Sequence, residues 1–130
     1  MKRARILAFF FDVLVCAGCA DVAGLAATAL LWESVPGGRE LIPWAWGAAG
    51  AGAVCAFLLR DSSGGRARRW LGLEVVRPDG RPPGAAASIR RNLPLLVPFW
   101  NLFDAWPVLR DGEAERVSDH ITGIRVRRAS

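Results

Sequence analysis

Residues 6–32 read ILAFFFDVLVCAGCADVAGLAATALLW, an apolar stretch that follows the positively charged opening at residues 1–5. As an α-helix it would be roughly 40 Å long, which exceeds the ~30 Å hydrocarbon core of a bilayer, so a tilted transmembrane helix is expected. A signal peptide also opens with positive charge, but its apolar region is shorter, and this stretch contains Asp12 and Asp21. The sequence therefore predicts a retained transmembrane helix.

A second apolar stretch, residues 41–59, follows a turn at residues 33–40 that contains Pro36, Gly37 and Gly38. Tryptophans flank this turn on both sides, where an interfacial aromatic belt is expected. The turn carries two acids and one arginine, whereas the other ends of both stretches carry only bases. The positive-inside rule predicts an external turn and a cytoplasmic amino terminus, with the chain in the inner membrane of a bacterium.

The net charge of +5 is concentrated between the apolar stretches rather than spread along the chain. A basic protein usually binds nucleic acid or an anionic membrane surface. Here the arginines cluster in residues 60–91, beside the second stretch, where topology-setting charge belongs. Because no helix-turn-helix, zinc finger or RNA-binding signature is present, we expect the lipid bilayer as a partner and no nucleic acid.

The cytoplasmic part is predicted to contain a small β element. Residues 73–77 alternate partly and precede a strong turn signal at residues 78–84, and residues 123–127 alternate again. We expect these two short strands to pair, which requires the basic segment 60–91 and the basic tail 110–130 to lie on one side of the membrane.

The third apolar stretch, residues 92–109, is poorly suited to a continuous transmembrane helix. Pro94, Pro98 and Pro107 each interrupt a helix, and basic residues flank both ends. A straight span would place the basic tail outside and separate the two strands. We therefore favour a re-entrant or interfacial segment, broken near residues 98–101, over a third span. The expected fold is a mainly α membrane protein in which a two-helix hairpin is joined to this broken segment.

Several motifs in order along the chain resemble those of the RDD family of membrane proteins. Arg5, Ala8 and Asp12 fit its R-x-x-A-x-x-x-D opening. The later matches are Asp61 with residues 65–76, Asp79-Gly80, Ser88-Ile89-Arg90-Arg91-Asn92 and residues 117–126, which contain the closing D-x-x-x-G pattern from Asp119. One departure is Ile124, where the family usually has threonine. The resemblance implies a membrane location and, from what has been suggested for some members, cation/proton exchange.

The candidate ion or proton site consists of Arg5, Asp12, Asn101, Asp104 and Asp119. A charge at the depth of Asp12 costs about 2.5–3.5 kcal/mol, so a partner or protonation is expected. We predict either a structural pair with an arginine of the cytoplasmic segment, such as Arg90 or Arg91, or a cation site where Asn101 and Asp104 converge on Asp12. Arg5 is expected to extend to the lipid headgroups. Asp119, beside the single histidine His120, is expected to cap a helix or anchor the tail.

Candidate partner contacts lie on the two long helices. Asp21 is nine positions from Asp12 and so points to the opposite face, and Gly24, Gly47 and Gly52 belong to rows of small residues that allow close helix packing. We interpret these rows as hairpin packing and as a surface for another subunit.

Two functions remain open from the sequence. One is a non-catalytic accessory or scaffold subunit of a larger membrane complex. The alternative is cation/proton transport by a homo-oligomer through Asp12 and Asp104. Cys16 and Cys19 match a C-x-x-C spacing, but both lie inside an apolar stretch without further ligands, so we expect no metal site, no cofactor and no enzyme activity.

Overall fold

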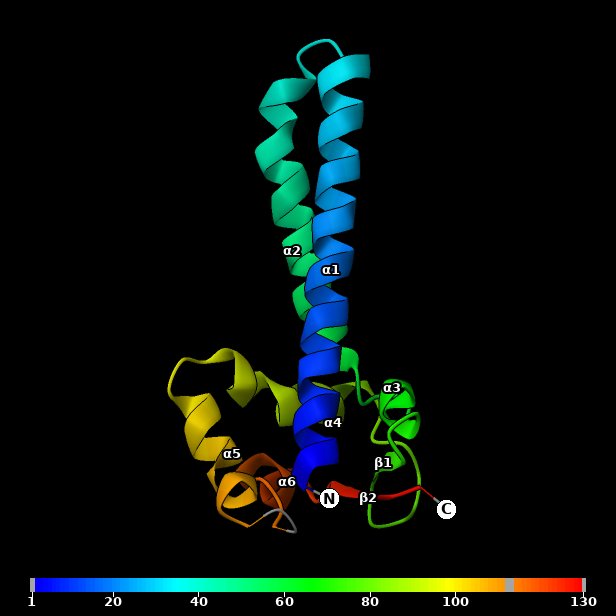
Figure 1. Cartoon of the computed structure of the whole chain (residues 1–130), viewed down its shortest axis with the longest axis vertical. Coiled ribbons are helices and arrows are strands. Elements are labelled where there is room, and N and C mark those ends of the chain that lie inside the picture. The colour runs from blue at the N-terminus through cyan, green and yellow to red at the C-terminus, as the bar shows by residue number, and fades with distance from the viewer. Residues whose placement is uncertain (1, 112–113, 130) are drawn as a thin grey trace. The chain divides into compact units, whose positions relative to one another are not determined.

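The computed structural model describes residues 2–111 and 114–129, and most of the chain is helical. It contains two compact units. The helical unit is Val13–Phe57, and the mixed unit combines Met1–Asp12 with Leu58–Ser130. Figure 1 shows the elements of both units.

Two helices are long and apolar enough to cross a membrane. Helix α1 (Lys2–Ser34) has 33 residues and α2 (Ile42–Leu59) has 18, and their candidate spans have mean hydropathies of 2.1 and 1.5. Between them, Gly37 adopts a φ of 72°, which glycine reaches without steric penalty, and a short 3₁₀ helix η1 (Gly38–Leu41) leads into α2. The two predicted apolar helices are therefore present, and α1 extends beyond its predicted ends.

Inside the helical unit, α1 and α2 run side by side (Figure 1), and Gly24 of α1 contacts Trp46 of α2. A Cβ atom at Gly24 would lie 2.6 Å from the ring of Trp46, so only glycine admits that ring here. The Trp46 indole donates a 3.0 Å hydrogen bond to Thr28 Oγ1, whose hydroxyl donates to the Gly24 carbonyl at 2.8 Å. Close approach at a small residue, fixed by a polar contact, is the expected packing mode of membrane helices.

The mixed unit gathers short elements around the first turns of α1. They are, in order, α3 (Arg66–Arg69), β1 (Leu73–Val76), α4 (Ala85–Asn92), η2 (Leu93–Leu96), α5 (Trp100–Arg110), α6 (Val117–Thr122) and β2 (Arg125–Arg128). Its apolar core includes Val75 and Ile124, both fully buried. The isoleucine that departs from the family pattern thus fills this core.

Strands β1 and β2 pair antiparallel, with Val75 opposite Val126 and Glu74 opposite Arg127. The Arg127 guanidinium donates to Glu74 at 3.1 Å, a cross-strand pair of opposite charge. The predicted pairing of two short strands is confirmed. Strand β2 begins two residues later than predicted because Gly123, with a φ of 67°, ends α6 first.

The segment predicted to be broken is indeed two short helices, η2 and α5, separated at Val97–Phe99. Pro94 lies at the start of η2, and Phe99 has a positive φ of 65° just before α5. The 11 residues of α5 rise only about 16 Å, roughly half of a bilayer core. Pro107 lies inside α5, where it removes one hydrogen bond without ending the helix.

Candidate functional site

The centre of the mixed unit is unusually polar. Besides Leu73, Val75 and Ile124, its fully buried side chains are charged or polar: Asp61, Ser88, Arg91, Asn92, Asp104 and Asp119. A buried charge is stable only when it is paired and hydrogen-bonded. The partners of these side chains therefore define the site, which we call the arginine–aspartate network.

The network begins at Asp12, in the third turn of α1. Asp12 is 7% exposed and its Oδ2 accepts from Arg68 Nη2 at 3.3 Å and lies 3.4 Å from Arg60 Nη1. Both arginines come from the basic segment that follows α2. The structural interpretation of Asp12, a partner for an arginine of that segment, thus fits. The predicted arginines were wrong: Arg90 is exposed, and Arg91 pairs elsewhere.

Asp61 joins this first pair to the next part of the network. Its Oδ1 lies 2.9 Å from Arg68 Nη1, and its Oδ2 accepts from Arg91 Nη1 and, at 2.9 Å, from the Asn92 amide. Ser88, one turn earlier on α4, donates to the Leu58 carbonyl at 2.6 Å and accepts from the Asp61 N–H at 3.2 Å. Helix α4 is therefore held to the end of α2 by polar contacts.

The far end of the network holds helix α6. Arg91 Nε donates to Asp119 at 2.6 Å, and Arg116 lies 3.4 Å from both Asp119 and Asp104. Asp104 on α5 accepts from the Ser118 N–H at 2.6 Å and from its hydroxyl at 3.0 Å, which satisfies an N–H that the first turn of α6 leaves free. Asp119 also accepts from the Arg116 N–H at 3.4 Å, so the predicted helix cap is confirmed.

The charges of the network are fixed by one another. Burial alone would raise the pKa of Asp61, but Arg91, Arg68 and Arg60 together hold it well below its usual range. Burial likewise opposes ionisation of Asp119, while Arg91 and Arg116 lower its pKa.

Arg60, Arg91 and Arg116 stay protonated at neutral pH. Burial and neighbouring arginines lower the pKa of Arg60 to about 9 and that of Arg116 to about 10. Burial also opposes the charge of Arg91, but Asp61 and Asp119 outweigh it and raise the pKa of Arg91.

Arg5 differs from Arg60, Arg68, Arg91 and Arg116, which pair with aspartates. Its guanidinium donates to two backbone carbonyls, Ala114 at 2.5 Å and Val126 at 3.2 Å. It is half-buried and directed into the protein, so the prediction that it extends to the lipid headgroups was wrong. Arg5 ties the start of α1 to the carboxyl-terminal part of the chain, because both carbonyls belong to that part.

The comparison with known families agrees with the motifs that form this network. A model of the RDD family matches residues 3–123. The chain belongs to the RDD family. No match was found among curated proteins or solved structures. Membership in this family and the two apolar helices fit a small membrane protein.

The structure separates Asp12 from Asp104, the two carboxylates of the predicted ion site of this RDD protein, whereas the other three predicted residues, Arg5, Asn101 and Asp119, line one cavity. Asp12 forms ion pairs with Arg60 and Arg68, whereas Asp104 forms an ion pair with Arg116 and accepts a hydrogen bond from Ser118. Within the described residues, no contact joins Asp12 to Asp104. Asn101 is half-buried and lines a cavity near α5.

Of the residues predicted to contact a partner, one packs inside the RDD protein and three are exposed. Gly24 is covered by Trp46 of the same chain, so it serves internal packing. Gly47 and Gly52 are exposed, with open space where a Cβ would lie. Asp21 is exposed in the middle of the first candidate span and has no ion pair or hydrogen bond to the described part of the chain.

Sequence reasoning placed Arg68, Arg91 and the two serines in family motifs but did not assign them to the network, and it did not single out Arg116. Helical spacing offered one usable signal: Ser88, Arg91 and Asn92 lie at i, i+3 and i+4, hence on one face of α4, and all three are buried. The other arginines carried no such signal, because the basic segment contains many of them and spacing does not distinguish buried from solvated ones.

Proposed function

We propose that this RDD protein is a non-catalytic accessory or scaffold subunit of a larger complex in the bacterial inner membrane. The observation that carries the proposal is the exposed carboxylate of Asp21 within a candidate span. A charged group at the centre of a bilayer costs about 2.5–3.5 kcal/mol, and intramembrane ionisable residues usually face a partner. Since this chain supplies no partner in its described part, a second protein is the natural source.

The exposed small residues of α2 support the same proposal. Gly47 and Gly52 leave the surface of that helix open to close approach by another backbone. Because lipid tails are as apolar as the helix surface, such close contacts and polar pairs supply the association energy. A partner helix with a basic or hydrogen-bonding side chain at the depth of Asp21 would use both features.

The arginine–aspartate network favours a scaffold over transport. A proton site needs a carboxylate whose protonation can change, and a cation site needs one that is not already neutralised by another cation. Asp12 and Asp104 instead form ion pairs with arginines. The pKa values of Asp61 and Asp119 are held low by pairing of the same kind. The network joins α1, α4, α5 and α6 into one unit, which suits a structural platform.

The topology within this proposal has both termini and the basic segment in the cytoplasm. The pairing of β1 with β2 and the bonds from Arg5 to Ala114 and Val126 support it, since a membrane cannot separate groups in contact. Helix α5 is then interfacial. Its exposed aromatic side chains Trp100, Phe103 and Trp106, with Phe99 just before the helix, are of the kind that occupies the membrane interface.

Co-purification tests the proposal. The tagged protein, solubilised in mild detergent without crosslinking, is expected to elute with a larger partner, and Asp21→Asn is expected to release that partner. Glu33→Gln is the matched control, because Glu33 is an exposed acid at the end of the same helix. Elution as a lone chain, or equal behaviour of the two variants, would contradict the docking role of Asp21.

A further inference from the structure

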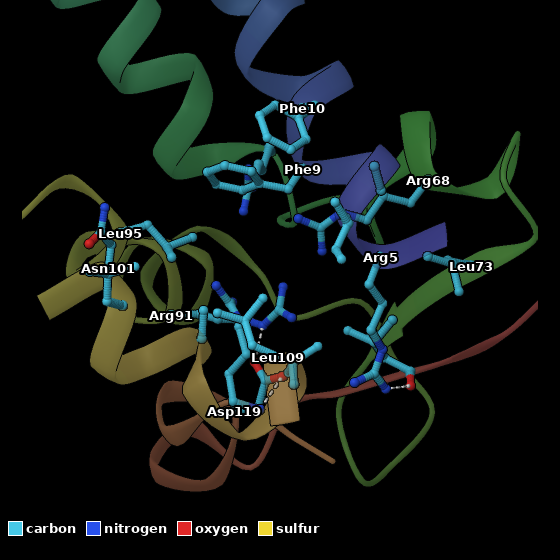
Figure 2. A pocket seen from close by; sticks show the side chains of 18 residues that line it. Arg5, Phe9, Phe10, Arg68, Leu73, Arg91, Leu95, Asn101, Leu109 and Asp119 are labelled. Carbon is cyan, nitrogen blue, oxygen red and sulfur yellow. Dashed lines mark hydrogen bonds and ion pairs between the residues drawn. The ribbon is translucent and has the colours of Figure 1, made fainter. Parts of the chain in front are cut away.

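A cavity of about 340 Å³ lies in the mixed unit (Figure 2). This volume falls in the range of small-molecule sites. Its apolar wall comes from the first turns of α1 and from η2 and α5, and includes Ile6, Phe9, Phe10, Leu95, Leu102 and Val108. Figure 2 shows Phe9 and Phe10 on the α1 side of the cavity and Leu95 and Asn101 on the side of α5.

The polar wall of this cavity is made mainly of guanidinium groups. It contains five arginines and one carboxylate: Arg5, Arg60, Arg68, Arg91, Arg116 and Asp119. The other network carboxylates, those of Asp12, Asp61 and Asp104, are not among the described lining residues. The surface that meets an occupant is therefore strongly positive, although most of these arginines have a carboxylate partner behind them.

The charges around the cavity do not cancel. In the described part of the chain, five arginines of the cavity wall stand against the four aspartates of the network. The excess is at Arg5, which bonds only to the carbonyls of Ala114 and Val126 and makes no ion pair with a described carboxylate. The buried Nε–H of Arg5 has no hydrogen-bond partner in the described residues. A buried donor without an acceptor is unfavourable. A singly charged anion would neutralise the excess positive charge and also provide an acceptor for the Arg5 Nε–H.

We propose that this cavity binds the phosphate headgroup of an anionic membrane lipid, with part of one acyl chain along the apolar wall. Guanidinium groups hold phosphate oxygens by paired, charge-assisted hydrogen bonds, and basic pockets at the cytoplasmic ends of membrane helices suit lipid headgroups. The apolar wall is what distinguishes a lipid from free phosphate. It includes residues of a candidate span, Ile6, Phe9 and Phe10, which would lie within reach of the bilayer.

Lipid titration of the purified full chain tests the inference, whether or not the chain is an accessory subunit. Native mass spectrometry in detergent would compare phosphatidylglycerol, phosphatidylcholine and inorganic phosphate. We expect one phosphatidylglycerol per chain, bound about tenfold more tightly than phosphatidylcholine, because only the former brings the missing net negative charge. If inorganic phosphate competes at concentrations equal to those of the lipid, the cavity is a small-anion site and the lipid proposal fails.

Two variants test the two walls separately. Arg5→Gln is expected to weaken phosphatidylglycerol binding about tenfold, whereas Arg128→Gln, which removes an exposed arginine outside the cavity, leaves binding unchanged. Ala105→Phe fills the apolar side without changing any charge and is also expected to weaken lipid binding. Should Arg5→Gln not fold, as judged by size exclusion, Ala105→Phe decides alone. Unchanged lipid affinity in Ala105→Phe would overturn the proposal.

Discussion

Arg91 of α4 and Asp119 of α6 form a buried ion pair, with 2.6 Å between Nε and Oδ1, across 28 positions of the chain. The same guanidinium also donates to Asp61, so one side chain connects the end of α2, α4 and α6. Removing one partner of a buried pair is far more harmful than replacing the whole pair, because it leaves a charge without compensation. Stability should therefore depend on Arg91 more than on Arg90, the other arginine of α4.

Arg91→Met tests this dependence. It leaves Asp61 and Asp119 buried with fewer partners, and we expect a loss of about 3–5 kcal/mol in unfolding free energy. Chemical denaturation in detergent micelles, followed by circular dichroism, measures the change. Arg90→Met is the control, since Arg90 is the exposed neighbour on the same helix. Equal losses in both variants would show that Arg91 is not the hub of the network.

Acid should destabilise the mixed unit. The folded pKa values of Asp61 and Asp119 lie below the unfolded value of about 3.9, so their pairing contributes stability above that pH. The contribution is lost as the pH falls through the folded values. Thermal unfolding midpoints should be level from about pH 6 to 8 and decline below about pH 4. In Asp119→Asn the acid-dependent loss should be smaller. A rise in stability on acidification would contradict the assigned charges.

The two aspartates of the first candidate span, Asp12 and Asp21, should respond differently to the same change. Asp12→Asn removes a charge that faces Arg68 and Arg60, and we expect about 1–3 kcal/mol less stability in the isolated chain. Asp21→Asn removes an exposed group and should leave the isolated chain as stable as the wild type, or more so. Denaturant titration in detergent compares them. A larger loss in Asp21→Asn would place its partner inside this chain.

Contact between α1 and α2 depends on a glycine. Gly24→Leu would force the Trp46 ring away and break its hydrogen bond to Thr28, at a cost of about 1–3 kcal/mol. Gly47→Leu is the matched variant, because no atom lies within 4 Å of a Cβ placed there. Thermal unfolding of the isolated chain should therefore separate them. Comparable midpoints would show that the Gly24 contact does not hold the helices together.

The sequence predicted the parts of the fold that depend on local pattern. The apolar helices, the two strands and the break in residues 92–109 follow from hydrophobic length, alternation and proline positions. Ion-pair partners do not follow from local pattern. Arg68 and Arg91 look alike in a segment rich in arginine. Only the tertiary contact of α3 with α1 assigns Arg68 to Asp12, and only the packing of α4 against α6 assigns Arg91 to Asp119.

The hydrogen-bond partners of Arg5 also could not be predicted from local sequence pattern. An arginine at the start of a membrane helix usually extends toward the headgroups, and local reasoning predicted that here. The carbonyl acceptors of Ala114 and Val126 come from more than a hundred residues away, in the tail. Such acceptors carry no side-chain signature, so no sequence motif could have indicated them.

The mass of the assembly released directly from membranes tests the proposed accessory role most directly. Native mass spectrometry of the wild-type protein should show this chain, 130 residues long, bound to at least one different and larger membrane protein. The Asp21→Asn variant should appear without that partner, and Glu33→Gln should retain it. A symmetric assembly of this chain alone, with the same mass in all three proteins, would contradict the account and favour self-association.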